Sequence, residues 1–91
     1  MKTQKILIES LAMDLKRVAL GLHTNSLPMA KRFKEEVLKR EAELESQKID
    51  DYVKRLLDGS RKALQNDNER AAEDALMYST LFQNYRIKNF K

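Results

Sequence analysis

The chain has 91 residues, of which 42% are hydrophobic and 35% are charged, and its formal net charge is +4. This length allows one domain, and the hydrophobic share is too high for a disordered chain of this charge. The absence of cysteine excludes disulfide and thiolate chemistry. Two glycines and one proline among many Glu, Lys, Leu and Ala residues predict an all-α fold. We expect a single antiparallel bundle of three or four helices across residues 1–91.

The N-terminal segment joins lysines to a short apolar run, as a signal peptide does, but Glu9 and Asp14 interrupt that run. No stretch approaches the roughly 18 apolar residues that span a bilayer. A small secreted domain would usually need disulfides for stability. We therefore expect a cytoplasmic protein that makes no use of a membrane.

The first predicted helix covers roughly residues 3–22. Thr3 is its candidate N-cap, and either Gly21 or Asn25 is the candidate left-handed residue that ends it. A short connection then leads to Pro28, so the second helix should fold back antiparallel. Apolar residues recur in the first helix at spacings of three and four, which predicts one buried face made of Ile8, Leu11, Leu15, Val18 and Leu22.

Residues 28–64 form the middle of the chain, and good helix formers fill them almost without a break. If the segment is helical, its apolar face rotates by about a third of a circle between Leu44 and Ile49, so the apolar residues form two stripes that are not aligned. The segment is therefore one long helix that changes partners, with a bend at Gly59, or two helices with a break near 46–50. The lack of a helix-breaking residue favours the continuous helix. The stripes are Ala30, Phe33, Val37 and Leu44, then Ile49, Tyr52, Val53, Leu56, Ala63 and Leu64.

The last predicted helix begins at a capping box, with Asn66 as the N-cap and Glu69 at the third position, and it runs to about Ile87. Its predicted buried stripe is Ala71, Ala75, Tyr78, Phe82 and Tyr85, with Leu76 and Leu81 beside it.

A continuous middle helix would have a consequence for assembly. It would be roughly 50 Å long, and two shorter helices could not cover both of its apolar stripes. We therefore expect a homo-oligomer, most simply a two-fold dimer.

The polar residues give little material for catalysis. Carboxylates precede basic residues by four positions, which is typical of a solvated helix face, at Glu35–Lys39, Glu36–Arg40, Asp50–Lys54 and Asp51–Arg55. No glycine-rich phosphate loop and no Glu-x-x-His pair for two metals occurs. We predict no catalytic, metal-binding or cofactor-binding residues. The sequence favours a non-enzymatic adaptor or regulator that acts through protein–protein interaction.

The C-terminal segment suggests an alternative function in nucleic-acid binding. Aromatic rings that stack on bases and cations that meet phosphates are the usual elements of single-strand binding. Basic doublets on the helices could extend such a surface, at Lys16-Arg17, Lys31-Arg32, Lys39-Arg40, Lys54-Arg55 and Arg61-Lys62. An anionic protein partner would suit the same group. The candidate binding residues are Tyr85, Arg86, Lys88, Phe90 and Lys91.

A second alternative concerns Arg17 and His23, the only histidine. Their Arg-x5-His spacing resembles the Arg-x4-6-His pair of HEPN ribonucleases, which would imply RNA cleavage by these two residues. The resemblance covers seven residues, lies on the first helix rather than a late one, and lacks the polar neighbour of the arginine. The other interpretation is that His23 ends a helix, where positive charge suits the helix dipole.

Overall fold

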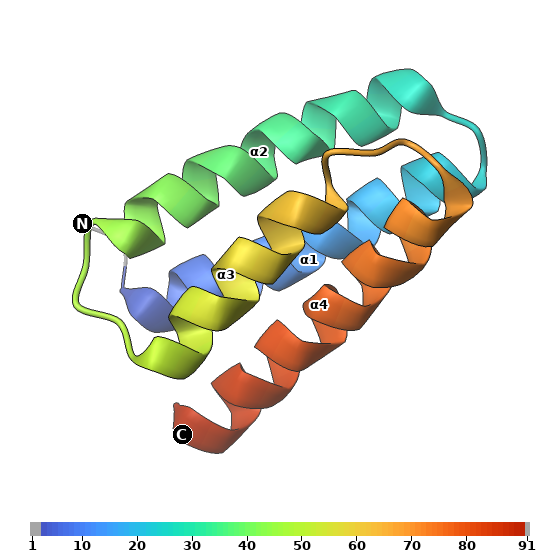
Figure 1. Ribbon diagram of the computed structural model, residues 1–91. Helices are drawn as coiled ribbons and strands as arrows, with labels where there is room; N and C mark the ends of the chain where they lie inside the picture. The colour runs from blue at the N-terminus through green and yellow to red at the C-terminus, as the bar shows by residue number, and fades with distance from the viewer. Residues whose placement is uncertain (1–2, 91) are drawn as a thin grey trace.

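The computed structural model of the chain describes residues 3–90. It contains four helices, α1 (Gln4–His23), α2 (Leu27–Glu45), α3 (Asp51–Ala63) and α4 (Glu69–Asn89), and no strand among the described residues. Consecutive helices run in opposite directions (Figure 1). The prediction of an all-α helical bundle is confirmed.

Helix α1 is the central element, since it packs extensively against both α2 and α4. Its predicted apolar face is buried in full. The hydroxyl of Thr3 accepts a hydrogen bond from the Ile6 amide, which confirms this N-cap. Asn25 adopts the left-handed conformation, with φ 58°, and ends the turn after α1. Gly21 has a different role: a Cβ there would lie 2.8 Å from the backbone nitrogen of Ala30, so glycine allows α1 and α2 to touch.

The middle segment is broken, so the prediction of one continuous helix from 28 to 64 was wrong. Helix α2 ends at Glu45, and α3 begins after Asp50, which has an extended backbone and whose carboxylate accepts a hydrogen bond of 2.9 Å from the Val53 amide. Ser46 closes α2 by donating its hydroxyl to the Glu43 carbonyl. Ser46 and Asp50 favour a break over a continuous helix, because Ser and Asp side chains satisfy free backbone groups better at a helix terminus than inside a helix. The apolar phase change between Leu44 and Ile49 marked this break.

The start of α4 also differs from the prediction. Asn68, rather than Asn66, caps the helix by accepting a hydrogen bond from the Ala71 amide at 2.9 Å. Asn66 and Asp67 stay in the connection because Lys34 of α2 binds both, through the Asn66 carbonyl and the Asp67 carboxylate. The loop between α3 and α4 is therefore fastened to α2.

The hydrophobic core lies mainly between α1, α2 and α4, and it is closed by α3. Tyr52, which was predicted to be buried, is instead 41% exposed, and Leu76, predicted to lie beside the buried stripe of its helix, is 49% exposed. Gly59 allows α3 and α4 to approach, because a Cβ there would meet the Tyr78 ring. Partly buried hydrophobic residues complete the core at its edges: Phe33, Leu64, Tyr78, Leu81, Tyr85 and Phe90.

Helices α2 and α3 meet through a buried polar contact. Glu41 is fully buried, and its Oε2 accepts a hydrogen bond of 2.7 Å from the buried hydroxyl of Ser60. Its other carboxylate oxygen, Oε1, has no hydrogen-bond partner, although Arg61 Nε approaches to 3.7 Å. Burial raises the pKa of Glu41, while Ser60 and Arg61 lower it by less. Burying a charge is costly, and Arg61 of α3 offsets part of that cost by pairing with both Glu41 and Glu45 of α2.

Candidate interaction surface

A groove runs along the outside of the α1–α4 contact. It consists of two hollows of ≈ 410 and ≈ 400 Å³, and Lys16 lines both of them. The surface is hollow here because several of the side chains that line it are small. Ser79 donates its hydroxyl to the Ala12 carbonyl at 2.6 Å and fixes the helices there. The small residues that line the groove are Ala12, Ala19, Ala72 and Ser79.

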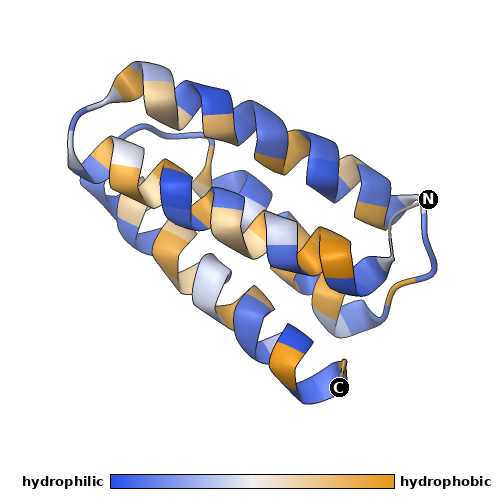
Figure 2. Cartoon of the chain, turned by 180° about the vertical axis from the view of Figure 1, so that it is seen from behind, coloured by the Kyte–Doolittle hydropathy of each residue, from blue (hydrophilic) through white to orange (hydrophobic). Residues whose placement is uncertain are grey.

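Exposed apolar side chains line this groove, namely Met13, Leu20 and Leu76, and helical spacing places Ile6 and Ile87 on the same sides of α1 and α4. Ile6, Met13 and Leu20 lie seven residues apart on α1, and each is about half exposed. On α4, Leu76 and Ile87 lie eleven residues apart, close to three full turns, so they share a face. We call these five residues together with the groove the α1–α4 face. Figure 2 views the bundle from behind and brings α1 to the front between α2 and α4, with hydrophobic bands along its length.

Charges of both signs border the α1–α4 face. Glu9 and Arg86 form an ion pair across one end of the groove, and Lys16 lies at its middle. The other end carries His23, Glu69 and Glu73. An apolar strip with a mixed polar rim is typical of a protein–protein contact. The sequence pattern alone does not reveal this face, because Leu76 lies beside the predicted buried stripe of its helix and the exposure of Ile6, Met13 and Leu20 depends on the fold.

The predicted C-terminal site is partly engaged within the chain. Tyr85 donates its hydroxyl to Asp50 Oδ2 at 2.6 Å and stacks on Tyr52, with ring centroids 5.8 Å apart. The rings of Phe90 and Tyr85 pack in a T-shaped arrangement, with their centroids 6.0 Å apart. Burial, and then the hydrogen bond to Asp50, raises the pKa of Tyr85 to about 12, and the same hydrogen bond lowers the pKa of Asp50. These rings therefore fasten the end of α4 to the break between α2 and α3.

The cations of that predicted site do not gather into one cluster. Arg86 is paired with Glu9 of α1, whereas Lys88 is exposed near the end of α4. Lys91 lies outside the described residues. Binding of nucleic acid or a partner by Tyr85, Arg86, Lys88, Phe90 and Lys91 stays a prediction, and it would require Tyr85 and Arg86 to exchange their present partners.

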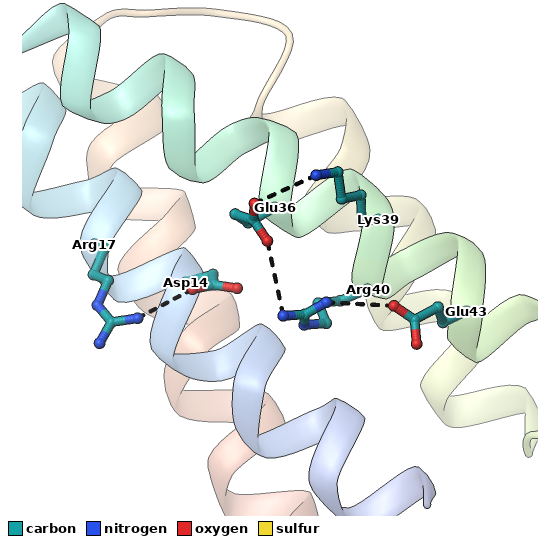
Figure 3. Close-up of polar contacts among 6 residues, drawn as sticks. All are labelled: Asp14, Arg17, Glu36, Lys39, Arg40 and Glu43. Atoms are coloured by element: carbon teal, nitrogen blue, oxygen red, sulfur yellow. Dashed lines mark hydrogen bonds and ion pairs between the residues drawn. The ribbon is translucent and has the colours of Figure 1, made fainter. Parts of the chain in front are cut away.

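Several members of the basic doublets are also paired within the chain. Asp14 is buried, burial raises its pKa, and Arg17 pairs with it at 3.2 Å. Figure 3 shows Arg40 between Glu36 and Glu43, with Lys39 also directed to Glu36. The predicted pair Glu36–Arg40 is thus present at 3.7 Å, whereas Lys39 pairs with Glu36 rather than Glu35. Lys54 pairs with Asp51, because Asp50 caps α3.

The structure separates Arg17 from His23. The Arg17 guanidinium lies over the Phe33 ring of α2, 5.3 Å from its centroid, whereas His23 lines the groove beside α4. Six residues of helix rotate a side chain by about 600°, which leaves these two on different sides of α1. RNA cleavage by this pair stays a prediction, and the geometry does not bring the two side chains toward one point. Among residues 3–90, no three His, Asp or Glu side chains come together as a metal site.

Comparisons with protein-family models, with curated protein sequences and with solved structures give no significant match for this chain. In the part of the chain that the structure describes, every helix is too short or too polar to cross a bilayer.

Proposed function

We propose that the chain is a non-catalytic helical module that docks another polypeptide on its α1–α4 face. One observation carries the proposal: α1 is apolar on two opposite sides. Its inner side, which includes Leu11 and Val18, is fully buried in the core, whereas Met13 and Leu20 on its outer side are 55% and 53% exposed. A helix in a small bundle usually needs only one apolar stripe.

The shape and polarity of the face agree with this proposal. The groove offers a depression for inserted side chains, and the apolar residues beside it would give up water on contact. The polar rim of Glu9, Lys16 and Glu73 could select the partner and its orientation. Charged side chains elsewhere on the described bundle are largely paired, as in the Arg17–Asp14 and Arg40–Glu43 ion pairs.

Site-specific photo-crosslinking tests this proposal. A benzophenone amino acid at position 13 should capture a polypeptide in cells that produce the protein. The same group at position 38 is the control, because Leu38 is 56% exposed on α2 and lies away from the groove. The captured polypeptide should then bind the purified chain, and Met13→Glu should reduce that binding far more than Leu38→Glu. Equal capture at both positions, or capture of nucleic acid at position 13, would contradict the proposal.

A further inference from the structure

We propose that the partner on the α1–α4 face is a second copy of this chain, with the two α1 helices antiparallel about a two-fold axis at Met13. This inference rests on the proposed function, because it names the occupant of the same face. It does not depend on a long middle helix, which the structure does not contain. The order of apolar and charged residues along α1 favours this arrangement.

The apolar residues on the outer side of α1 are arranged symmetrically about Met13. Ile6 precedes it by seven residues and Leu20 follows it by seven, so all three share one side of the helix. A two-fold axis at Met13 therefore places Ile6 of one copy against Leu20 of the other, twice, and places the two Met13 side chains together. Three apolar layers result, and each buries groups that are about half exposed in the single chain.

The charges beside this stripe favour the antiparallel orientation. Glu9 and Lys16 both lie on the edge of the stripe that faces α4, because both line the groove. In an antiparallel pair related by two-fold symmetry, like edges of the two helices face each other. Glu9 lies four residues before Met13 and Lys16 three residues after it, so each Glu9 meets the Lys16 of the other copy. The interface would therefore gain two attractive Glu9–Lys16 pairs. The Glu9 side chain is 38% exposed even though it pairs with Arg86, so it is accessible to the second copy.

A parallel orientation would be opposed by the same residues. The other edge of the outer stripe carries Arg17, which lies toward α2 over Phe33. Parallel two-fold packing brings opposite edges of the helices together at the same height, so Lys16 of each copy would meet Arg17 of the other. Like charges facing each other at an interface are unfavourable and suppress that arrangement. Charge complementarity thus selects one of the two orientations and identifies the chain as its own partner.

Cysteine cross-linking tests the register directly, because the chain has no cysteine of its own. Under mild oxidation, Met13→Cys should form a disulfide-linked dimer rapidly. Leu38→Cys, with matched exposure on α2, should form one only slowly. A mixture of Ile6→Cys and Leu20→Cys chains should yield the mixed dimer faster than either chain links to itself, because a disulfide needs Cα atoms within about 7 Å. Helical circular dichroism spectra of the reduced variants confirm that they fold.

Each other outcome overturns the inference. Faster self-linking of Ile6→Cys and of Leu20→Cys than of their mixture would show a parallel pair. Equal rates for Met13→Cys and Leu38→Cys would show that no second copy occupies the face. If the benzophenone at position 13 then captured a different polypeptide, the second copy would be excluded while the docking function remained. If position 13 neither formed the disulfide-linked dimer nor captured a polypeptide, the proposed docking function would be contradicted as well.

Discussion

At the scale of single residues, the buried carboxylate of Glu41 is the least expected feature of the bundle. A helix in a small domain would normally present an apolar residue where Glu41 lies between α2 and α3. Ser60 satisfies one carboxylate oxygen, but Oε1 has no hydrogen-bond donor. The buried charge therefore opposes folding at neutral pH, and it makes this contact sensitive to pH.

The stability of the wild type relative to Glu41→Gln should rise as the pH is lowered from 7. Burial holds the pKa of Glu41 above its usual value of 4.5, so the folded chain takes up a proton at pH values where the unfolded chain has none. The free-energy cost of the carboxylate therefore falls as the pH decreases through the folded pKa toward 4.5. Glutamine keeps an acceptor for Ser60 and has no such dependence.

Urea unfolding at a series of pH values measures this difference. The control is Glu35→Gln, which changes the same kind of group at an exposed position on the same helix. A gap between the wild type and Glu41→Gln that stayed constant between pH 7 and 4.5 would show that burial does not perturb this carboxylate.

At the scale of the helices, the break between α2 and α3 shows what local sequence could and could not predict. Helix content, the apolar face of α1, the Thr3 cap and the Asn25 turn all follow from residues within a few positions of each other. The break does not follow from local sequence in this way, because the helix propensity of residues 46–50 favours a continuous helix while the apolar phase change and the Asp50 cap oppose it. The caps and the tertiary contacts of Ile49 and Tyr85 override a propensity worth only tenths of a kcal/mol per residue.

Replacing Asp50 should separate its two roles. Asp50→Ala removes the N-cap of α3 and should lower the free energy of unfolding by about 0.5–2 kcal/mol, whereas Asp50→Asn keeps a capping oxygen and should cost less. Both changes remove the carboxylate that accepts from Tyr85, so the pKa of Tyr85 should fall from about 12 toward its ordinary value of 10.0. Part of the rise should remain, because burial is its larger cause.

Chemical denaturation measures the free energy of unfolding of the Asp50 variants. Absorbance titration of the phenol, in a chain that also carries Tyr52→Phe and Tyr78→Phe, measures the pKa of Tyr85. In the wild type, the stability that Tyr85 contributes is complete below pH 10 and is lost between pH 10 and 12, since the unfolded chain loses that proton first. An unchanged Tyr85 pKa in Asp50→Asn would contradict the described hydrogen bond.

At the scale of the whole molecule, the candidate site was harder to predict than the fold. The C-terminal residues were chosen for their chemical type, yet Tyr85 and Arg86 hold α4 to other parts of the bundle. The α1–α4 face depends on which side of each helix remains uncovered, and that is decided by the packing of four helices together. The seven-residue spacing of Ile6, Met13 and Leu20 is visible in the sequence, but the exposure of these three side chains is known only from the fold.

Sedimentation equilibrium over a concentration series tests the central claim most directly. The wild type should sediment as a species of twice the 10.7 kDa chain mass. Met13→Glu should be a monomer with unchanged helix content, because it places two carboxylates at the two-fold axis, and Leu38→Glu should remain a dimer. A wild type that stays monomeric throughout the series, or a Leu38→Glu variant that dissociates as readily as Met13→Glu, would contradict the account.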